Sequence, residues 1–384
     1  MPDRTFGVGV IGANPARGWA SRAHVPAIQA SNAFRLAAVA TTRVQSAGDA
    51  RQRFGADNAF TDAASLAQHP DVDLVVVTVK VPAHLELVTV ALDAGKHVYC
   101  EWPLTRTAAE AASLVRAVEA AGVHAVVGLQ ARFAPAIIRA RAMLAEGSLG
   151  TLRSVNVYSA RSKGNSRAIP VWTAYTYDAQ DGAGLVEVLG GHALDLVQYL
   201  AGPIRQLSAR TALLTPEHLA AETGEVIDVT AADHLLAVAE LENGAVVSMH
   251  LHDTEAALPR TRVEIMGSAG DLALVSSPET DPWAAQLQIG RLDLYHAAAG
   301  DSTWRPVAVP PDAFDALPTE AANVARLYDQ LAQDLRTDTH RAPGFRTAYK
   351  LHELLELSAD RRTGNLPGAP PKRRSMSHER AQAR

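Results

Sequence analysis

The sequence predicts a two-domain α/β protein, with a doubly wound parallel sheet first and an α/β domain built on a large open, mainly antiparallel sheet second. The chain has 384 residues, which is too long for one ordinary core. Short apolar runs alternate with helical segments up to about residue 130, whereas longer alternating runs follow residue 150. We therefore expect domains at 1–130 and 131–363, followed by a flexible basic tail at 364–384.

The first domain is predicted from strands that are each followed by a helix. The expected strands are Phe6–Ile11, Arg35–Ala40, Asp73–Val79, His97–Cys100 and Ala125–Leu129. The third is nearly continuous in valine and leucine, which is typical of a parallel strand buried on both faces. Helices are expected from about Trp19 and at Pro82–Ala94 and Ala108–Ala121, where alanine-rich segments have helical spacing.

The second domain is predicted from runs that alternate between apolar and polar residues. The expected strands are Thr151–Ala160, Ile204–Thr211, Asp233–Leu241, Ala245–Leu251, Arg262–Met266 and Asp271–Val275. Glu242-Asn243-Gly244 predicts a tight hairpin between two of them. Helices at Glu320–Leu335 and Phe345–Arg361 complete the domain. Because a wide alternating sheet needs a cover, we expect its open face to form a homodimer or homotetramer.

Composition excludes several classes of function. Apolar residues make up 47% of the chain, charged residues 20%, and the formal net charge is −5. That balance gives no electrostatic reason to expect nucleic acid or an anionic membrane as partner. Cys100 is the only cysteine, so no intrachain disulfide can form and a reducing cytoplasm is expected. Neither a signal peptide nor a membrane-spanning run is recognisable.

The turn after the first strand predicts a dinucleotide site. A pyrophosphate requires a tight turn, a close backbone approach and a helix start. Gly12 supplies the turn, Asn14 stands where a second glycine usually stands and tolerates a left-handed backbone, and Gly18 implies a longer loop. Arg17 is placed to reach a phosphate. The alternative is an ordinary strand-to-helix turn.

The end of the second strand predicts which dinucleotide binds. Thr41, Thr42 and Arg43 stand where an acid would favour NAD. Two hydroxyls and a guanidinium suit a 2′-phosphate, so we expect NADP, with NAD possible. The alternative is that Arg43 opens the next helix and faces solvent.

Histidines supply the candidate acid–base chemistry. His192 opens an apolar helical pattern and is a candidate catalytic proton donor or acceptor, or else a packed histidine under the site. Asp195 is expected to be a structural acceptor, and His84 to cap a helix or line the cleft. His250 and His252 point to one face of a strand, but no third ligand is evident, so no metal is predicted.

Several sequence blocks together resemble the Gfo/Idh/MocA oxidoreductase family, and within it the Gal80-like branch. They are GVIGAN, HLELVTVALDAGKHVYCEWPL, GLQARFAP, GGHALDLVQYLAG and FRTAYKLHELLELSADRRTG, with GANPARGWASRAHVPAI and VKVPAH favouring the branch. The resemblance implies an N-terminal Rossmann domain. It implies cofactor contacts from the strand ends and the turns that follow them, namely Trp19, Val79, Pro82, His84, Glu101, Trp102 and Gln130.

The resemblance also implies two departures from the usual catalytic group. Trp102 stands where most enzymes of the family carry a lysine, and an indole cannot exchange a proton at neutral pH. The usual aspartate falls on Val188, with Glu187 one residue away. His192, Lys163, Tyr177 or water could replace the lysine. The polar segment 162–177, with Lys163, Trp172 and Tyr177, is expected to line the substrate cleft or to form a structural loop.

Two functions from different classes follow from the resemblance. One is an NAD(P)-dependent oxidoreductase that acts on a sugar, cyclitol or polyol derivative by hydride transfer. The other is a dinucleotide-binding sensor without turnover, like the fungal galactose-pathway repressors of the branch, which would act through a protein partner.

Overall fold

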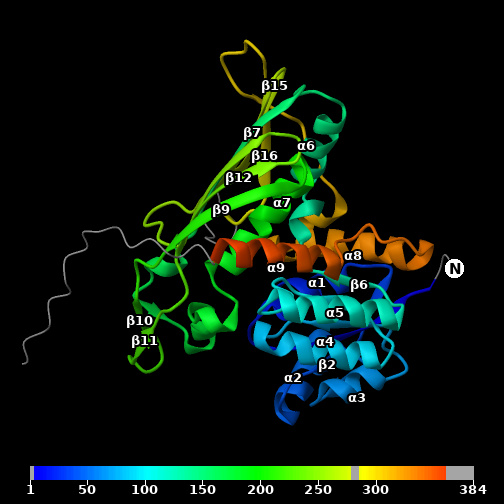
Figure 1. Cartoon of the computed structure of the whole chain (residues 1–384). Coiled ribbons are helices and arrows are strands. Elements are labelled where there is room, and N and C mark those ends of the chain that lie inside the picture. Colours follow the sequence, from blue (N-terminus) through cyan, green and yellow to red (C-terminus); the bar gives the residue numbers. More distant parts are fainter. Residues whose placement is uncertain (1–3, 278–284, 360–384) are drawn as a thin grey trace, which may run out of the picture.

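A computed structural model describes residues 4–277 and 285–359. Its N-terminal third forms a parallel sheet, as predicted, with six strands in the order β3-β2-β1-β4-β5-β6 (Figure 1). The strands are β1 Phe6–Ile11, β2 Phe34–Ala40, β3 Asn58–Phe60, β4 Leu74–Val77, β5 His97–Cys100 and β6 Ala125–Val127. The sequence did not predict β3, which is too short to show a period.

Helices cover this sheet. They are the π-helix η1 Ala20–His24, α1 Val25–Gln29, α2 Val44–Phe54, α3 Ala63–Gln68, η2 Val81–Ala83, α4 His84–Asp93 and α5 Ala108–Ala121. Helices are found close to the three predicted segments, whereas α2 and α3 were not predicted. α5 illustrates the local signals: the Thr107 hydroxyl accepts from the Glu110 backbone N–H at its start, and Gly122 ends it with a φ of 64°.

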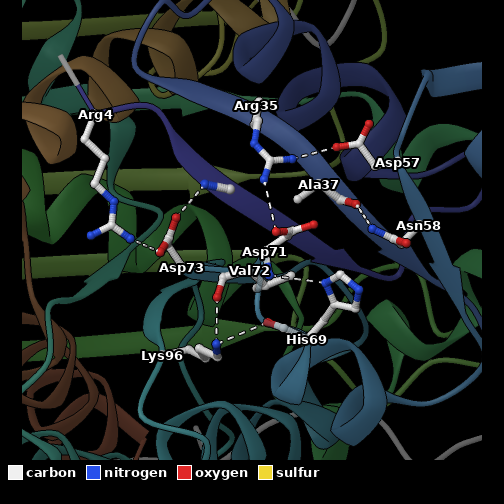
Figure 2. Close-up of polar contacts among 11 residues, drawn as sticks. Arg4, Arg35, Ala37, Asp57, Asn58, His69, Asp71, Val72, Asp73 and Lys96 are labelled. Carbon is white, nitrogen blue, oxygen red and sulfur yellow. Dashed lines mark hydrogen bonds and ion pairs between the residues drawn. The ribbon is translucent and has the colours of Figure 1, made fainter.

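Polar contacts fasten the amino ends of the parallel strands, at the edge opposite to the one where ligands bind in such sheets (Figure 2). The Asp73 carboxylate accepts from the backbone N–H of Gly7 at 2.8 Å and pairs with Arg4. The Lys96 ammonium donates to the carbonyl oxygen of Val72 at 2.8 Å. Because each contact joins neighbouring strands or their loops, the contacts at this edge stabilise the sheet.

The later part of the chain forms an eight-stranded sheet in the order β17-β16-β15-β14-β7-β13-β12-β9 (Figure 1). Only the pair β13 and β7 is parallel, so the sheet is mainly antiparallel as predicted. The strands are β7 Leu152–Ala160, β9 Ile204–Ala212, β12 His234–Leu241, β13 Val246–His252, β14 Arg260–Gly267, β15 Gly270–Ser276, β16 Leu292–Ala298 and β17 Arg305–Pro306. The predicted hairpin is confirmed, with Gly244 at a φ of 84°.

A small three-stranded sheet lies beside this domain, in the order β11-β10-β8, and was not predicted. Its strands are β8 Ala168–Ile169, β10 Glu217–Ala220 and β11 Val226–Asp228. The connecting helices are η3 Gln130–Phe133, α6 Pro135–Ala145, η4 Lys163–Asn165, η5 Val171–Tyr177, η6 Ala179–Asp181, η7 Val186–Gly190, α7 Gly191–Ala201 and η9 Ala313–Ala316.

Two long helices, α8 Thr319–Thr337 and α9 Phe345–Ala359, run between the two large sheets (Figure 1). α8 packs on η1 and α1, where its buried Tyr328 meets Tyr99 and Phe34. α9 packs on α5 and on β9, and its residues belong to a hydrophobic core that continues from β4 and β5 into the large open sheet. The strand ends of the first sheet are thereby fixed against the second.

The open sheet presents an apolar face. Leu236, Val238 and Val246 are 47%, 60% and 55% exposed there, beside a shallow hollow of ≈ 920 Å³. Self-association through this face, like the domain limits given above, stays a prediction. The predicted tail at 364–384 and the last residues of the Phe345–Arg361 helix lie outside the described residues. Within the described ranges, no helix is long and apolar enough to cross a bilayer.

Candidate functional site

A cavity of ≈ 430 Å³ lies at the carboxyl ends of β1, β4 and β5, closed on its other side by residues of the second domain. The structure brings together thirteen of the residues that the sequence predicted for the site, namely Gly12, Asn14, Arg17, Gly18, Trp19, Val79, His84, Glu101, Trp102, Gln130, Lys163, Trp172 and His192. Thr41, Thr42, Arg43, Pro82 and Tyr177 are not among its lining residues.

The turn after β1 forms one wall. Gly12 has a φ of 90°, and a Cβ on it would lie 2.8 Å from the Val79 Cγ1, so both the backbone conformation and the space require glycine. Asn14 does not use the left-handed backbone that the sequence suggested, because no asparagine of the described ranges has a positive φ. Its side chain instead accepts from the backbone N–H of Ala16 at 2.9 Å, which stabilises the turn.

The end of β2 lies beside this turn, since the backbone N–H of Gly12 donates to the carbonyl oxygen of Ala40 at 3.0 Å. The Thr41 hydroxyl is 2.7 Å from that of Ser46, and Arg43 is the N-cap residue of α2 with an extended backbone. Thr42 and Arg43 are exposed. This edge therefore presents a hydroxyl and a guanidinium to solvent next to the glycine turn, outside the cavity.

Residues after β4 hold the floor of the cavity. His84 is buried, with its Nε2 3.1 Å from the carbonyl oxygen of Val79 and its Nδ1 3.0 Å from that of Pro103. Burial lowers the pKa of His84, whereas the carbonyl oxygens that face both ring nitrogens raise it. His84 thus ties the ends of β4 and β5 together, and Pro82 sits in the short η2 turn that precedes it.

A buried relay that the sequence did not reveal fixes Glu101 at the end of β5. His24 of η1 places its Nε2 2.7 Å from the Glu101 carboxylate and its Nδ1 2.9 Å from the Tyr328 hydroxyl of α8. Burial raises the pKa of Tyr328 well above its ordinary value, so the hydroxyl keeps its proton. The His24 ring thereby links the Glu101 carboxylate to α8.

Trp102 joins β5 to α7. Its indole N–H donates to the carbonyl oxygen of Glu187 at 2.9 Å, and its ring lies 4.8 Å from that of His352. A Cβ on Gly191 would lie 2.2 Å from the indole, so the ring occupies space that only glycine leaves. Val188 lines the cavity, whereas Glu187 is not among the lining residues, in agreement with the expectation that its side chain points elsewhere.

The second domain contributes the polar groups opposite. The Lys163 ammonium donates to the Thr176 hydroxyl at 2.6 Å, and burial lowers its pKa to about 8. Burial and the nearby Arg161 lower the pKa of His192 to about 3. Tyr177 stands behind Lys163, 4.5 Å from its ammonium, with its hydroxyl directed to the Lys163 carbonyl oxygen and its pKa raised by burial.

Arg161 was missed because nothing in its sequence neighbourhood marks it. It follows β7, is 7% exposed, and binds the Asp253 carboxylate through two nitrogens, one at 2.8 Å. Asp195 is the structural acceptor that the sequence predicted. Its carboxylate accepts hydrogen bonds from two guanidinium nitrogens of Arg132, one at 2.8 Å.

Aromatic side chains of η5 cover cations at the mouth. The Arg17 guanidinium lies 5.5 Å from the Trp172 ring, and the Lys80 ammonium lies 4.8 Å from the Tyr175 ring. Trp172 is 39% exposed and lies at the rim. A cation over an aromatic face is attracted by the ring quadrupole, so η5 is held against the loops after β1 and β4.

Four buried polar atoms of the lining have no hydrogen-bond partner among the described residues. They are Trp19 Nε1, Gln130 Oε1, His192 Nδ1 and Gln288 Oε1. Buried polar atoms without partners are rare because each costs roughly 1–3 kcal/mol. Their convergence on one cavity fits a ligand that carries both donors and acceptors.

Comparison with known proteins gives two family matches. The Gfo/Idh/MocA model, described as an oxidoreductase family with an NAD-binding Rossmann fold, matches residues 6–129. A model of the C-terminal domain of Gal80p matches residues 135–276.

Individual relatives include both regulators and enzymes. The galactose/lactose metabolism regulatory protein GAL80 of Kluyveromyces lactis is 30% identical over 313 residues, which cover 76% of this chain and 67% of the relative. D-apiose dehydrogenase of Paraburkholderia graminis is 30% identical over 260 residues, or 67% and 65% of the two chains. The crystal structure of a super-repressor mutant of Saccharomyces cerevisiae Gal80p matches with a TM-score of 0.81 at 25% identity, covering 93% and 95%.

Proposed function

Because the chain belongs to the Gfo/Idh/MocA oxidoreductase family, with a Gal80-like C-terminal domain, we propose that it is an NADP-dependent oxidoreductase acting on a sugar, cyclitol or polyol derivative. The observation that carries the proposal is the convergence of four unpartnered buried polar atoms on the cavity at the carboxyl ends of β1, β4 and β5. This is where a Rossmann sheet binds its dinucleotide.

The residues of the turn after β1 fit a dinucleotide. Gly12 and Gly18 both have positive φ values, which opens the backbone for a close approach by pyrophosphate, and Arg17 supplies a positive charge beside it. Thr42 and Arg43 would hold a 2′-phosphate outside the cavity, which supports NADP; NAD is the alternative cofactor. The bound nicotinamide supplies the hydride chemistry.

Other residues of the cavity offer groups that would bind the dinucleotide and the substrate. On the dinucleotide side, the Gln130 amide oxygen offers an acceptor and the Trp19 indole N–H a donor. From the second domain, His192 offers its Nδ1 and Gln288 its amide oxygen. Trp172 offers an aromatic face at the rim for a sugar ring. The packed indole of Trp102 is 5% exposed and lines the cavity, and we propose that it stands where relatives carry a catalytic lysine.

Lys163 is the group best suited to exchange the substrate proton. A pKa of about 8 leaves both protonation states populated near neutral pH, as an efficient acid–base catalyst requires. His192, with a pKa of about 3, stays neutral, so we assign it a catalytic role as hydrogen-bond partner of the reacting hydroxyl. Tyr177 keeps its proton and supports Lys163 from behind the cavity.

The proposal is tested by following reduced cofactor after adding NADP⁺ with a panel of sugars and polyols, and its consumption after adding NADPH with ketoses and keto-sugars. We expect turnover with at least one class. His192→Ala should then lower kcat by about tenfold or more, since a positioned acid–base or hydrogen-bonding group contributes about 10²–10⁴-fold. An unchanged rate in this variant would remove His192 from the mechanism.

A second candidate function is a dinucleotide-dependent sensor that acts through a protein partner. The similarity to GAL80 regulators over two thirds of their length favours it. It predicts tight dinucleotide binding, measured by fluorescence titration, together with complete silence across both panels. Absence of binding to either pyridine dinucleotide would contradict both functions.

The single cysteine, buried Cys100, agrees with the cytoplasm as the compartment we propose.

A further inference from the structure

A cluster of metal-ligating side chains lies at the opposite edge of the parallel sheet from the proposed dinucleotide cleft. His124 directly precedes β6, while Asp338 and His340 follow the end of α8. One ligand atom from each of the three lies within 4.8 Å of the others. The His124 Nε2 is 3.4 Å from an Asp338 carboxylate oxygen, and the rings of His124 and His340 stack with centroids 4.4 Å apart.

We propose that these three residues bind a divalent transition metal of the zinc type. Two imidazoles and a carboxylate form a ligand set that suits Zn²⁺, with bonds of about 2.0–2.2 Å and hence neighbouring ligand atoms about 3.4 Å apart. The ligand atoms already lie within 4.8 Å of one another, and rotation of the exposed His340 ring out of its stack on His124 would direct both imidazoles at one ion. A water molecule completes the tetrahedron from the solvent side, where the Asp338 side chain is 93% exposed.

The backbone holds both segments of the site in place without the metal. Asp334, which is 1% exposed, accepts from the backbone N–H groups of Arg341 and Ala342 at 2.9 and 2.8 Å, and this fixes the loop that carries the second and third ligands. That loop then joins β6, because the Val127 backbone N–H donates to the Pro343 carbonyl oxygen at 2.9 Å. A site built on ordered segments loses little conformational entropy when it binds.

A third histidine, His97, lies beside the three proposed ligands but is not one of them. The Nδ1 of His97 accepts from the backbone N–H of His124 at 3.1 Å, so His97 positions the first ligand rather than completing the set. A bound metal would fasten the connection between α8 and α9 to the edge strand of the sheet. It would stabilise the fold there and take no part in the chemistry of the cleft.

The test is calorimetric titration of the chelator-treated full-length protein with ZnCl₂, compared with His340→Ala and Asp338→Asn. Both replaced side chains are exposed, so the variants should fold, and asparagine keeps the left-handed backbone of residue 338. We expect one zinc ion per chain at this site and an affinity about tenfold or more lower in each variant, because even an outer-shell change typically costs 10–100-fold. His296→Ala, in strand β16, is the matched control and should bind like the unaltered protein.

Thermal unfolding supplies an independent measurement. Zinc should raise the midpoint of the unaltered protein and of His296→Ala but not that of His340→Ala. Unchanged zinc affinity in both ligand variants would overturn the proposal by placing the ion elsewhere, and so would a complete lack of zinc binding. NADP titration with and without zinc should give the same affinity, so failure here is distinct from failure of the proposed function.

Discussion

Replacing Trp102 tests how the end of β5 works. The side chain is 5% exposed, its N–H donates to the Glu187 carbonyl oxygen, and its ring fills the space beside Gly191 and His352. If the indole is a packed joint between β5 and α7, its loss should cost stability first. If it acts in chemistry, its loss should lower turnover while the fold stays intact.

The expected magnitude follows from this burial. A large aromatic side chain buries about 150–250 Å², which at about 25 cal/mol per Å² corresponds to roughly 4–6 kcal/mol. Truncation of Trp102 to alanine keeps the Cβ, so we expect the free energy of unfolding to fall by about 3–5 kcal/mol. Phenylalanine keeps most of the ring but removes the donor, so Trp102→Phe should cost about 1–2 kcal/mol.

The assay is urea denaturation followed by far-ultraviolet circular dichroism, with NADP affinity and turnover measured on the same samples. Trp304→Phe is the control, because Trp304 is 38% exposed and its replacement should change stability by less than about 0.5 kcal/mol. A cost below about 1 kcal/mol for Trp102→Ala would refute the packing argument. Turnover lost in Trp102→Phe at nearly unchanged stability would show instead that the indole takes part in the reaction.

Three further predictions concern the proposed cleft. Gly12→Ala puts a Cβ 2.8 Å from Val79 Cγ1 at a φ of 90°, so fluorescence titration should show NADP affinity reduced by about tenfold or more; Gly48→Ala, where a Cβ meets nothing within 4 Å, should leave it unchanged. Arg43→Ala should weaken NADP by about ten- to hundredfold and NAD much less, if a charge-assisted hydrogen bond is lost; equal losses would place the 2′-phosphate elsewhere. Polyol oxidation should rise with pH through about 8, because only the neutral Lys163 amine accepts a proton, whereas the reverse reduction should fall over the same range. Lys163→Met should remove that inflection, and an inflection that persists would assign it to another group.

The type and the bounds of several strands and helices were predictable from the sequence. The valine-rich run that forms β4 indicated a strand buried on both faces, and β5 and α5 begin and end at the residues that the pattern indicated. In contrast, β3 and β8 have three and two residues, too few to show a period. Their pairing partners hold them in place.

The sequence by itself determined the two kinds of sheet and the need for glycine at position 12, because periodicity and backbone freedom are local properties of a chain. Only the tertiary structure decided that His24 of η1 and Tyr328 of α8 meet the carboxylate of Glu101, and that Arg161 lies beside His192. It likewise decided that Lys163 is buried deeply enough to have a pKa near 8. These contacts join residues far apart in sequence, so they depend on how finished elements pack and leave no periodic trace along the chain.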